Sequence, residues 1–459
     1  MCIRDSVYNV KDKPGFGKTL VFALQQLLAI MAATIAVPMI ISGSYDSVGN
    51  VSMSTAAALF GAGVGTLVYL LFTKFRSPVF LGSSFAFLGS MSAAFAGAAS
   101  MQAGYLGLII GAVLAGLVYV VIALVVKIAG VGWIDKLMPA VVIGPTVAII
   151  GLSLSGNAVG DLVKGSVLNA EGVPVANTYI ALLCGLVTLA VTMLCSTYGK
   201  KMIKMIPFII GIVAGYAVAA IFTVIGKAAG VEALQVINFS AFENMQWLPD
   251  FTFLEAFKGV KDISGGYIAT LAVAYVPVAF VVFAEHIADH KNISSIIEKD
   301  LLKEPGLHRT LLGDGVGSML GAFFGGCPNT TYGESVGCVA ISGNASVVTI
   351  LTTAILAIVI AFIAPFIAFL STIPSCVMGG VCIALYGFIA VSGLKMIQNV
   401  DLGDNRNLFV VSVILIAGVG GLTLNFGKVT LTQVACALIL GILTNLILKK
   451  RVGKKSSDK

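Results

Sequence analysis

Apolar runs long enough to cross a membrane recur from one end of the chain to the other. They fall at 19–41, 52–73, 79–98, 103–126, 137–154, 177–197, 203–225, 266–288, 308–326, 330–344, 346–370, 374–397, 407–424 and 429–448. Only 11% of the 459 residues are charged, which is too few to cover a water-facing surface. Because an α-helix crosses the apolar layer with about 20 residues, we predict an all-α polytopic membrane protein with fourteen spans.

The positions of Lys and Arg agree with this count. With fourteen spans, most of the 28 Lys and Arg residues fall in connections on the side of the two termini. The other side holds only Lys164, Lys227, Lys258, Lys261 and Lys428. Loops rich in Lys and Arg stay in the cytoplasm, so we predict cytoplasmic termini. The basic tail 449–459 is then mainly a topology signal.

Two pairs of segments indicate an internal repeat. The stretch "MPAVVIGPTVAIIGLSLSG" (138–156) resembles "IPSCVMGGVCIALYGFIAVSG" (373–393), half a chain away. The short spans with "GSSFAFLGS" (82–90) and "NTTYGESVG" (329–337) are each third in their half. Seven spans per half make the second half enter the membrane from the opposite side. Paired, interrupted segments of such inverted repeats mark a substrate site near the midplane.

Few ionisable residues lie in or beside the apolar runs, and the clear ones are three carboxylates, each of which costs about 2.5–3.5 kcal/mol in a bilayer and is a functional candidate. Glu285 and Asp289 are one helical turn apart, and Glu334 lies in the tenth span. Two acids at this spacing hinder each other's ionisation, which suits a reversible proton carrier. Their oxygens also suit Na⁺, and a purely structural network is a third reading. We expect His286 and His290 to be interfacial side chains at the helix end.

The sequence contains no signature of an enzyme or a cofactor protein. The eight Cys form no C-x-x-C pair and have no His at ligand spacing, which favours small buried side chains. No Ser/His or Cys/His arrangement lies at membrane depth, so an intramembrane hydrolase is disfavoured. We therefore predict no catalytic activity, no cofactor and no metal centre apart from a possible Na⁺ at Asp289, and no nucleic-acid partner.

One long stretch identifies a family. The segment "AEHIADHKNISSIIEKDLLKEPGLHRTLLGDGVGSMLGAFFGGCPNTTYGESVG" (284–337) closely resembles the nucleobase–cation symporters of the nucleobase–ascorbate transporter family. Its elements "AEHI", "PGLHR" and "PNTTYGE" are similar to the branch of bacterial uracil permeases. The xanthine and urate branch typically carries Gln where Glu334 stands. The resemblance runs over nearly the whole chain.

The resemblance implies an architecture. Spans one to four (19–126) and eight to eleven (266–370) would form a core domain, and the remaining spans (137–225 and 374–448) a gate domain. Short antiparallel strands in spans three and ten would meet at the substrate. The implied protein is a homodimer in the bacterial inner membrane, with cytoplasmic ends 1–18 and 449–459, whose core moves against the gate as in an elevator.

The resemblance also implies cation-coupled uptake of uracil and names the residues of the site. Glu285 and Glu334 match the two glutamates that hydrogen-bond the pyrimidine, and Phe85 matches the aromatic residue that packs on the ring. The other matching positions are Ser84, Tyr332 and Gly333, which would line the site, and Tyr386, which would face it from the gate domain.

Three positions depart from the family pattern and leave alternatives open. Asp289 stands where the family usually has His, so Asp289 and Glu285 would carry a proton or, alternatively, Na⁺. Gln26 replaces the His of a Gln-His pair, and Ser335 replaces an Asn, so both bear on which base fits. A purine permease of the same family is the first alternative. An anion transporter of the sulfate-transporter type is less favoured, since its site requires positive groups rather than two acids.

Overall fold

The computed structural model describes residues 8–130, 132–133, 138–169, 172–200, 202–243, 245–426 and 429–448. The expected basic tail 449–459 and the first part of the expected segment 1–18 lie outside these residues. The described chain is predominantly helical, as predicted. Three pairs of short strands interrupt the helices.

Among the residues that the structure describes, eight helices are long and apolar enough to cross a membrane. They are α1 (Phe16–Ile41), α2 (Thr55–Phe72), α4 (Met101–Ala129), the continuous pair α6 and α7 (Ala140–Ser153 and Ser155–Asp161), α8 (Thr178–Tyr198), α10 (Pro207–Ala229), α12 (Gly265–Ile297) and α17 (Ser375–Met396). A ninth candidate is α15 (Val347–Ile360) with α16 (Ala364–Ser371), which are bent by 84° at their junction. These spans make the chain a multi-pass membrane protein.

The remaining elements are shorter or less apolar. The other helices are α3 (Leu88–Ala96), α9 (Met202–Met205), α11 (Thr252–Ala256), α13 (Leu307–Gly325), α14 (Gly333–Ser342), α18 (Asn405–Val419) and α19 (Gln433–Ile447). The strands are β1 (Gly43–Tyr45), β2 (Gly49–Val51), β3 (Leu81–Ser83), β4 (Asn329–Thr331), β5 (Leu424–Phe426) and β6 (Val429–Leu431). Short 3₁₀ or π segments are η1 (Phe85–Phe87), η2 (Glu232–Leu234), η3 (Ser240–Phe242), η4 (Phe257–Asp262) and η5 (Leu302–Gly306). The third and tenth expected spans therefore each consist of a strand followed by a short helix.

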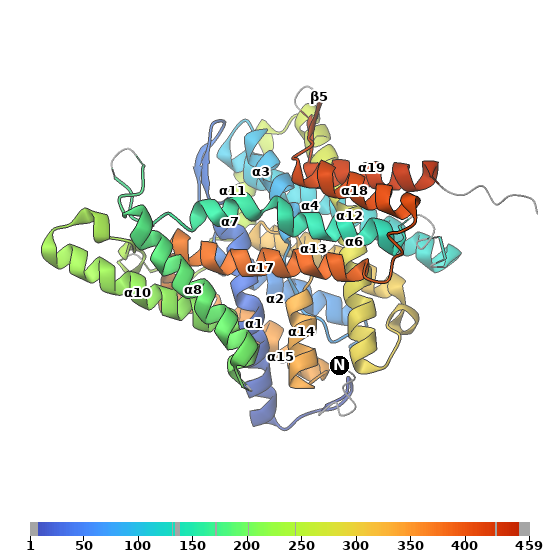
Figure 1. The fold of residues 1–459 in the computed structure, drawn as a ribbon, viewed down its shortest axis with the longest axis horizontal. Coiled ribbons are helices and arrows are strands. Elements are labelled where there is room, and N and C mark those ends of the chain that lie inside the picture. Colours follow the sequence, from blue (N-terminus) through green and yellow to red (C-terminus); the bar gives the residue numbers. More distant parts are fainter. Residues whose placement is uncertain are drawn as a thin grey trace, which may run out of the picture.

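The helices pack in two groups of contacts. In one group α13 packs along α2 and α4, and α15 packs on α1 and α2. In the other group α17 packs along α6 and α8, and α18 and α19 pack on α6. Figure 1 shows α1 upright beside α14 and α15, whereas α6 and α17 lie across it. Contacts of α12 with α6 and α19, and of α1 with α10 and α17, join the two groups.

The close packing of α2 on α13 depends on glycine. A Cβ atom at Gly61 would lie 2.6 Å from the carbonyl oxygen of Gly321, and one at Gly65 would lie 2.8 Å from that of Gly317. Small residues at such spacing let helix backbones approach closely in membranes. These helices flank β3 and β4, so their close approach helps to position the strand pair.

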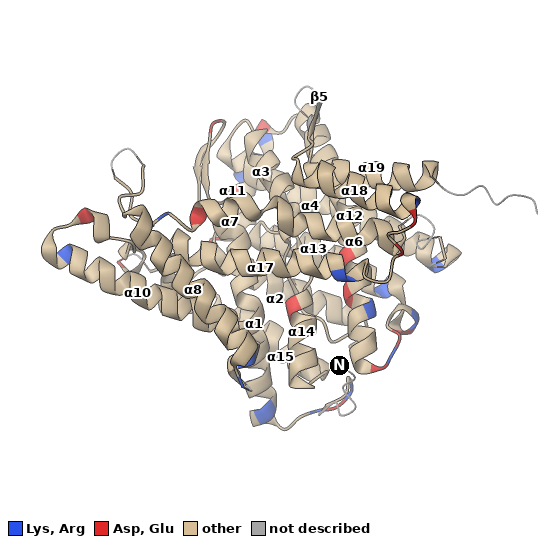
Figure 2. Cartoon of the chain, viewed as in Figure 1, with Lys and Arg blue, Asp and Glu red and all other residues tan. Residues whose placement is uncertain are grey.

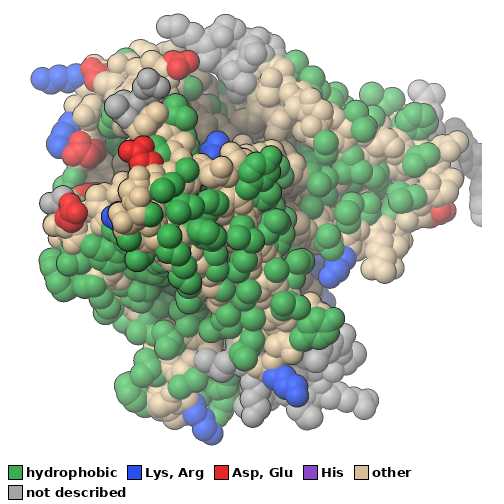
Figure 3. Space-filling view, turned by 60° about the vertical axis from the view of Figure 1, so that its left-hand side comes forward, with side chains coloured by type: hydrophobic (Ala, Val, Ile, Leu, Met, Phe, Trp, Pro, Cys, Tyr) green, Lys and Arg blue, Asp and Glu red, His purple; other side chains and the backbone are tan. Residues whose placement is uncertain are grey.

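The outer surface is apolar where α8 and α10 lie. In their most apolar windows only 28% and 33% of the residues are buried, against 72% for α1. Leu186, Leu194, Val213 and Ile221 are among their exposed side chains. Hydrophobic side chains dominate the face shown in Figure 3, and most charged residues lie at helix ends and in connections (Figure 2). Such a surface suits contact with lipid.

Candidate functional site

The two interrupted segments meet as a pair of antiparallel strands, as expected. Gly82 of β3 is paired with Thr330 of β4. Two further backbone hydrogen bonds extend the pairing: Ser84 N donates to Pro328 O over 2.9 Å, and Tyr332 N donates to Phe80 O over 3.2 Å. The strands are thus bonded to each other, which satisfies backbone groups that have no partner in lipid.

Each strand leads directly into a helix at the centre of the protein. After β3 the chain turns through η1, which begins at Phe85, into α3. After β4 it enters α14, whose first turn holds Glu334. A carboxylate in a first turn is favoured by the positive end of the helix dipole. The local fold therefore places an aromatic ring and an acid at the ends of the paired strands.

Two features fix the strand pair in place. The Nδ2 of Asn329 donates to the carbonyl oxygen of Gly61 over 3.0 Å. Tyr332 Oη donates to Ser83 O over 2.7 Å, and its ring lies directly against Gly82, where a Cβ atom would be 2.4 Å from ring carbons. Only glycine fits at Gly82 without displacing this ring.

One face of α12 carries the other acids. Glu285, Ala288, Asp289 and Asn292 follow the i, i+3, i+4, i+7 spacing of one helix face, and all four border the same cavity. Asp289 is 9% exposed, and its Oδ2 accepts a hydrogen bond from Thr331 Oγ1 over 2.8 Å. This bond ties the helix to β4.

The cavity has a volume of about 290 Å³ and lies between the strand pair, α12 and the helices α8 to α10 and α17. Six of the expected site residues line it: Phe85, Glu285, Asp289, Tyr332, Gly333 and Glu334. Its wall also includes Ala29, Lys204, Phe208, Asn292, Thr330, Cys338, Phe388 and Ser392. A flat polar molecule in this cavity would meet carboxylates, a strand edge and an aromatic face.

Two expected residues lie behind this wall. Tyr386 is 3% exposed and does not line the cavity, but its ring packs edge-on against Phe85 with the centroids 5.5 Å apart. Ser84 is buried and takes part through its backbone N–H in the strand pairing. Tyr386 therefore orients the ring of Phe85, and Ser84 supports the strands.

Gln26 and Ser335 are bonded to each other behind the cavity. The Nε2 of Gln26 donates to Ser335 Oγ over 2.6 Å, and Phe80 N donates to the same oxygen over 3.1 Å. Both polar side chains are buried, and neither lines the cavity. They join α1 and the residue before β3 to the first turn of α14, directly after Glu334.

The expectation that His286 and His290 are interfacial is wrong, because both are fully buried. They face away from the cavity and stack on each other, with ring centroids 4.0 Å apart. Their partners lie on the neighbouring helices α2 and α13. His290 Nδ1 donates to His286 O over 2.8 Å, so in the neutral ring Nε2 accepts from Tyr69 Oη over 2.7 Å.

His286 forms a buried acid–base pair with Asp314. Its Nδ1 lies 2.7 Å from Asp314 Oδ2, and its Nε2 lies 3.0 Å from Thr310 Oγ1. Since the Thr310 hydroxyl donates to Leu307 O, Nε2 of His286 carries a hydrogen. One proton is then shared between Nδ1 and Asp314, which keeps the pair neutral overall. Sequence reasoning missed Asp314, although an acidic residue within the apolar run 308–326 could have marked it as a candidate.

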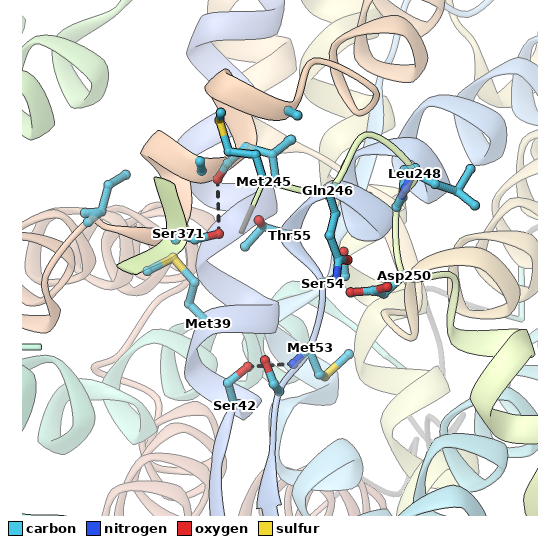
Figure 4. Close-up of a pocket in the computed structure, with 18 of the residues that line it drawn as sticks. Met39, Ser42, Met53, Ser54, Thr55, Met245, Gln246, Leu248, Asp250 and Ser371 are labelled. Atoms are coloured by element: carbon cyan, nitrogen blue, oxygen red, sulfur yellow. Dashed lines mark hydrogen bonds between the residues drawn. The ribbon is translucent and has the colours of Figure 1, made fainter. Parts of the chain in front are cut away.

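A second cavity, of about 430 Å³, lies where α1 ends and α2 begins. Figure 4 shows Ser42, Ser54, Thr55 and Ser371 around it, with Met39, Met53 and Met245. Its one carboxylate, Asp250, accepts from the Gln246 amide over 3.1 and 3.0 Å when the amide nitrogen faces it. None of the expected site residues borders this cavity.

The first cavity offers oxygen ligands and an apolar face. In the described part of the chain no group of three or more His, Cys, Asp or Glu side chains is arranged to hold a metal ion.

Sequence reasoning missed two residues that line this cavity, Asn292 and Lys204. Asn292 had a readable signal, because it lies seven residues after Glu285 on the same face. Lys204 lies in the four-residue helix α9, which is too short to show a periodicity, so its place depends on tertiary structure.

Comparison with known proteins gives a consistent result. The model of the permease family matches residues 17–426. The chain is 39% identical over 448 residues to the uracil permease of Bacillus caldolyticus, covering 97% of this chain and 95% of that protein. It is 38% identical to the uracil permease of Bacillus subtilis (strain 168) and 34% to that of Escherichia coli (strain K12), each covering 96% of this chain and 94% of the relative.

Solved structures with little sequence similarity share the fold. The transmembrane domain of a cyanobacterium bicarbonate transporter, BicA, superposes with a TM-score of 0.58 at 16% identity, covering 95% of this chain and all of that domain. The murine anion transporter Slc26a9 in the inward-facing state gives 0.61 at 12% identity, covering 95% of this chain and 69% of that one. With a family model matched over most of its length and relatives above 30% identity, the chain belongs to the permease family that includes the bacterial uracil permeases, and it is a membrane permease rather than an enzyme.

Proposed function

We propose that this protein is a secondary active transporter that takes up uracil or a related nucleobase together with a cation. The observation that carries the proposal is the cavity at the ends of the paired strands, where Glu285 and Glu334 face a common space beside Phe85. The permeases reported above, at 34–39% identity, are named for uracil. The proposal assigns the same class of substrate to this chain.

The chemistry of the wall suits a pyrimidine base. Uracil has two N–H donors, two carbonyl acceptors and a flat ring. A carboxylate accepts hydrogen bonds from N–H groups, and we assign this role to Glu285 and Glu334. Phe85 would pack on the ring, and backbone groups at Tyr332 and Gly333 would meet the carbonyls.

The second acid on α12 fits the coupling step. We assign Asp289, with Glu285, to the coupling cation, a proton in the first place and Na⁺ as the alternative. Asp289 is hydrogen-bonded to Thr331 on β4. A change in the charge of Asp289 therefore alters the hydrogen bond to the strand that leads into Glu334. Binding of the cation and of the base would therefore be linked. We assign to Gln26 and Ser335 an influence on which base binds, because their hydrogen bond helps to set the position of Glu334.

The proposal includes the architecture implied by the family resemblance. Fourteen spans in two inverted repeats would form a core domain (19–126 and 266–370) and a gate domain (137–225 and 374–448), in a homodimer of the bacterial inner membrane. The core would move against the gate to give alternating access. With both termini in the cytoplasm, the ends of α8 and α12 beside the cavity also face the cytoplasm, so the cavity opens inward.

Two other classes of substrate are alternatives. A purine base would meet the same groups, so a xanthine permease is the first alternative. The likeness to BicA and Slc26a9 concerns the fold alone. An inorganic anion would face three carboxylates, Glu285, Asp289 and Glu334, whose charge opposes its binding.

The test is equilibrium binding of radiolabelled uracil to the purified protein, with unlabelled uracil, xanthine and bicarbonate as competitors. We expect competition by uracil and none by bicarbonate. Glu334→Gln should weaken binding about 10-fold or more, since a hydrogen bond to a charged group contributes about 1.5–3 kcal/mol. Glu243→Gln, an exposed glutamate away from the cavity, is the matched control. Absence of uracil binding, or stronger competition by xanthine than by unlabelled uracil, would replace the substrate assignment, and equal affinity in both variants would refute the site.

A further inference from the structure

One basic side chain, that of Lys204, shares the cavity with the three carboxylates. Among the described residues that line it, Lys204 is the only Lys or Arg, whereas Glu285, Asp289 and Glu334 are acids. Lys204 is exposed, and no described carboxylate forms a salt bridge with it within 4 Å. Its charge therefore acts on the wall of the cavity without being neutralised by a fixed partner.

The position of Lys204 is fixed by the packing of α9. This short helix lies between α8 and α10 and contacts α1 and α14. Next to it, Ile206 packs against Ala29 of α1 and Cys338 of α14, in an apolar contact separate from the main core. Lys204 thus sits where the helix pair α8 and α10 meets the helix that carries Glu334.

Lys204 and the three acids belong to different domains of the proposed transporter. Lys204 is in the gate domain, whereas Glu285, Asp289 and Glu334 are in the core domain. If the core moves and the gate stays, the three carboxylates share a cavity with Lys204 only while that cavity opens to the cytoplasm. Opposite charges near a protein surface stabilise each other substantially, because the dielectric there is lower than in water.

We infer that Lys204 is a counter-charge that promotes release of the coupling cation into the cytoplasm. Its ammonium group stabilises the carboxylates in their cation-free form in the inward-open state, and so lowers their affinity for a proton or for Na⁺ on that side. The inference rests on the proposed cation-coupled transport, and it adds a directional role for a residue outside the substrate contacts.

A simpler role for Lys204 is that of a topology signal like its neighbour Lys200. Lys200 lies in the same connection and is also exposed, but it does not line the cavity. The two lysines therefore form a matched pair. Loss of either removes the same charge from the loop, and only loss of Lys204 removes it from the wall of the cavity.

The test separates net uptake from exchange in proteoliposomes. Net uptake of radiolabelled uracil under an imposed inward cation gradient requires cation release inside. Exchange of external labelled uracil for internal unlabelled uracil does not, because the loaded carrier can return with its cation bound. We expect Lys204→Gln to slow net uptake about tenfold, which corresponds to about 1.4 kcal/mol, and to leave exchange close to the wild-type rate. Lys204→Arg and Lys200→Gln should retain both activities.

Two results with Lys204→Gln would overturn the inference. Equal loss of uptake and exchange in Lys204→Gln would make the residue structural and overturn the inference, as would normal net uptake. Exchange in Lys204→Gln also shows that this variant is folded. Absence of both activities in the wild-type protein would instead refute the proposed function.

Discussion

Replacing His286 by Ala tests the buried pair of His286 and Asp314, which lies on the side of α12 that faces away from the cavity. The side chains of His286 and Asp314 are 0% and 2% exposed, and Asp314 Oδ2 lies 2.7 Å from Nδ1 of His286. The other oxygen, Oδ1, has no hydrogen-bond partner among the described residues. Removing the imidazole leaves a buried acid with neither oxygen paired. Breaking a buried ion pair by removing one partner costs about 3–5 kcal/mol, and we expect a loss of this size in the free energy of unfolding.

Unfolding of the purified protein by increasing SDS in mixed micelles, followed by circular dichroism, measures this loss. The matched control is His308→Ala, because His308 lies outside the buried pair. The double variant His286→Leu with Asp314→Leu removes both polar partners, and such apolar replacements of buried pairs are often neutral or stabilising. The double variant should therefore be more stable than His286→Ala. If His286→Ala is as stable as the wild type, or the double variant is no more stable than the single one, the pairing does not hold this helix in place.

Three further predictions concern the cavity. Glu285→Ala and Glu334→Gln should each abolish uracil uptake in cells while the protein still reaches the membrane; near-normal uptake with either one would remove it from the site. Asp289→Asn should weaken the cation dependence of uptake more than the binding of uracil, measured by uptake at several imposed gradients; equal loss of both would place Asp289 on the substrate. Gly82→Ala should weaken uracil binding, since overpacking costs about 1–3 kcal/mol and the new methyl group must displace the ring of Tyr332; a competition assay with unchanged affinity would show that the ring is not held there.

The sequence predicted the centre of the fold because its signals there are local. Glycine, proline and polar residues interrupt two apolar runs at corresponding places, and the structure confirms that β3 and β4 pair at those breaks. The spacing of Glu285 and Asp289 likewise puts both on one helix face, and both line the cavity. The assignment of Glu285 and Glu334 to the substrate remains a prediction that the binding and uptake experiments test.

What the sequence did not predict depends on contacts between distant segments. The hydrophobicity of the segment around His286 suggested a helix end near the interface, but α12 continues to Ile297 and buries this side chain against α13. Tyr386 and Ser335 are near the site as expected, yet each acts behind the wall, on Phe85 and on Gln26 respectively. Helical periodicity gives the direction of a side chain around its own axis, and it does not give the neighbour it meets.

The span count shows the same limit. In the described part of the chain, length and composition identify eight spanning helices, or nine with the bent pair, against the fourteen spans predicted. The difference lies in segments that are broken or short, such as β3 with α3, β4 with α14, and α18 and α19. A segment buried among other helices need not be a long apolar helix, so length and composition alone do not test whether these segments are spans, and the fourteen-span repeat stays a prediction.

The most direct test of the central claim is uptake of radiolabelled uracil into proteoliposomes under a proton gradient and a Na⁺ gradient imposed separately. We predict accumulation driven by an inward cation gradient, by protons in the first place. Accumulation only with Na⁺ would assign Glu285 and Asp289 to that ion. No accumulation of uracil under either gradient, with protein that is folded and inserted, would contradict the proposal that this permease is a uracil–cation symporter.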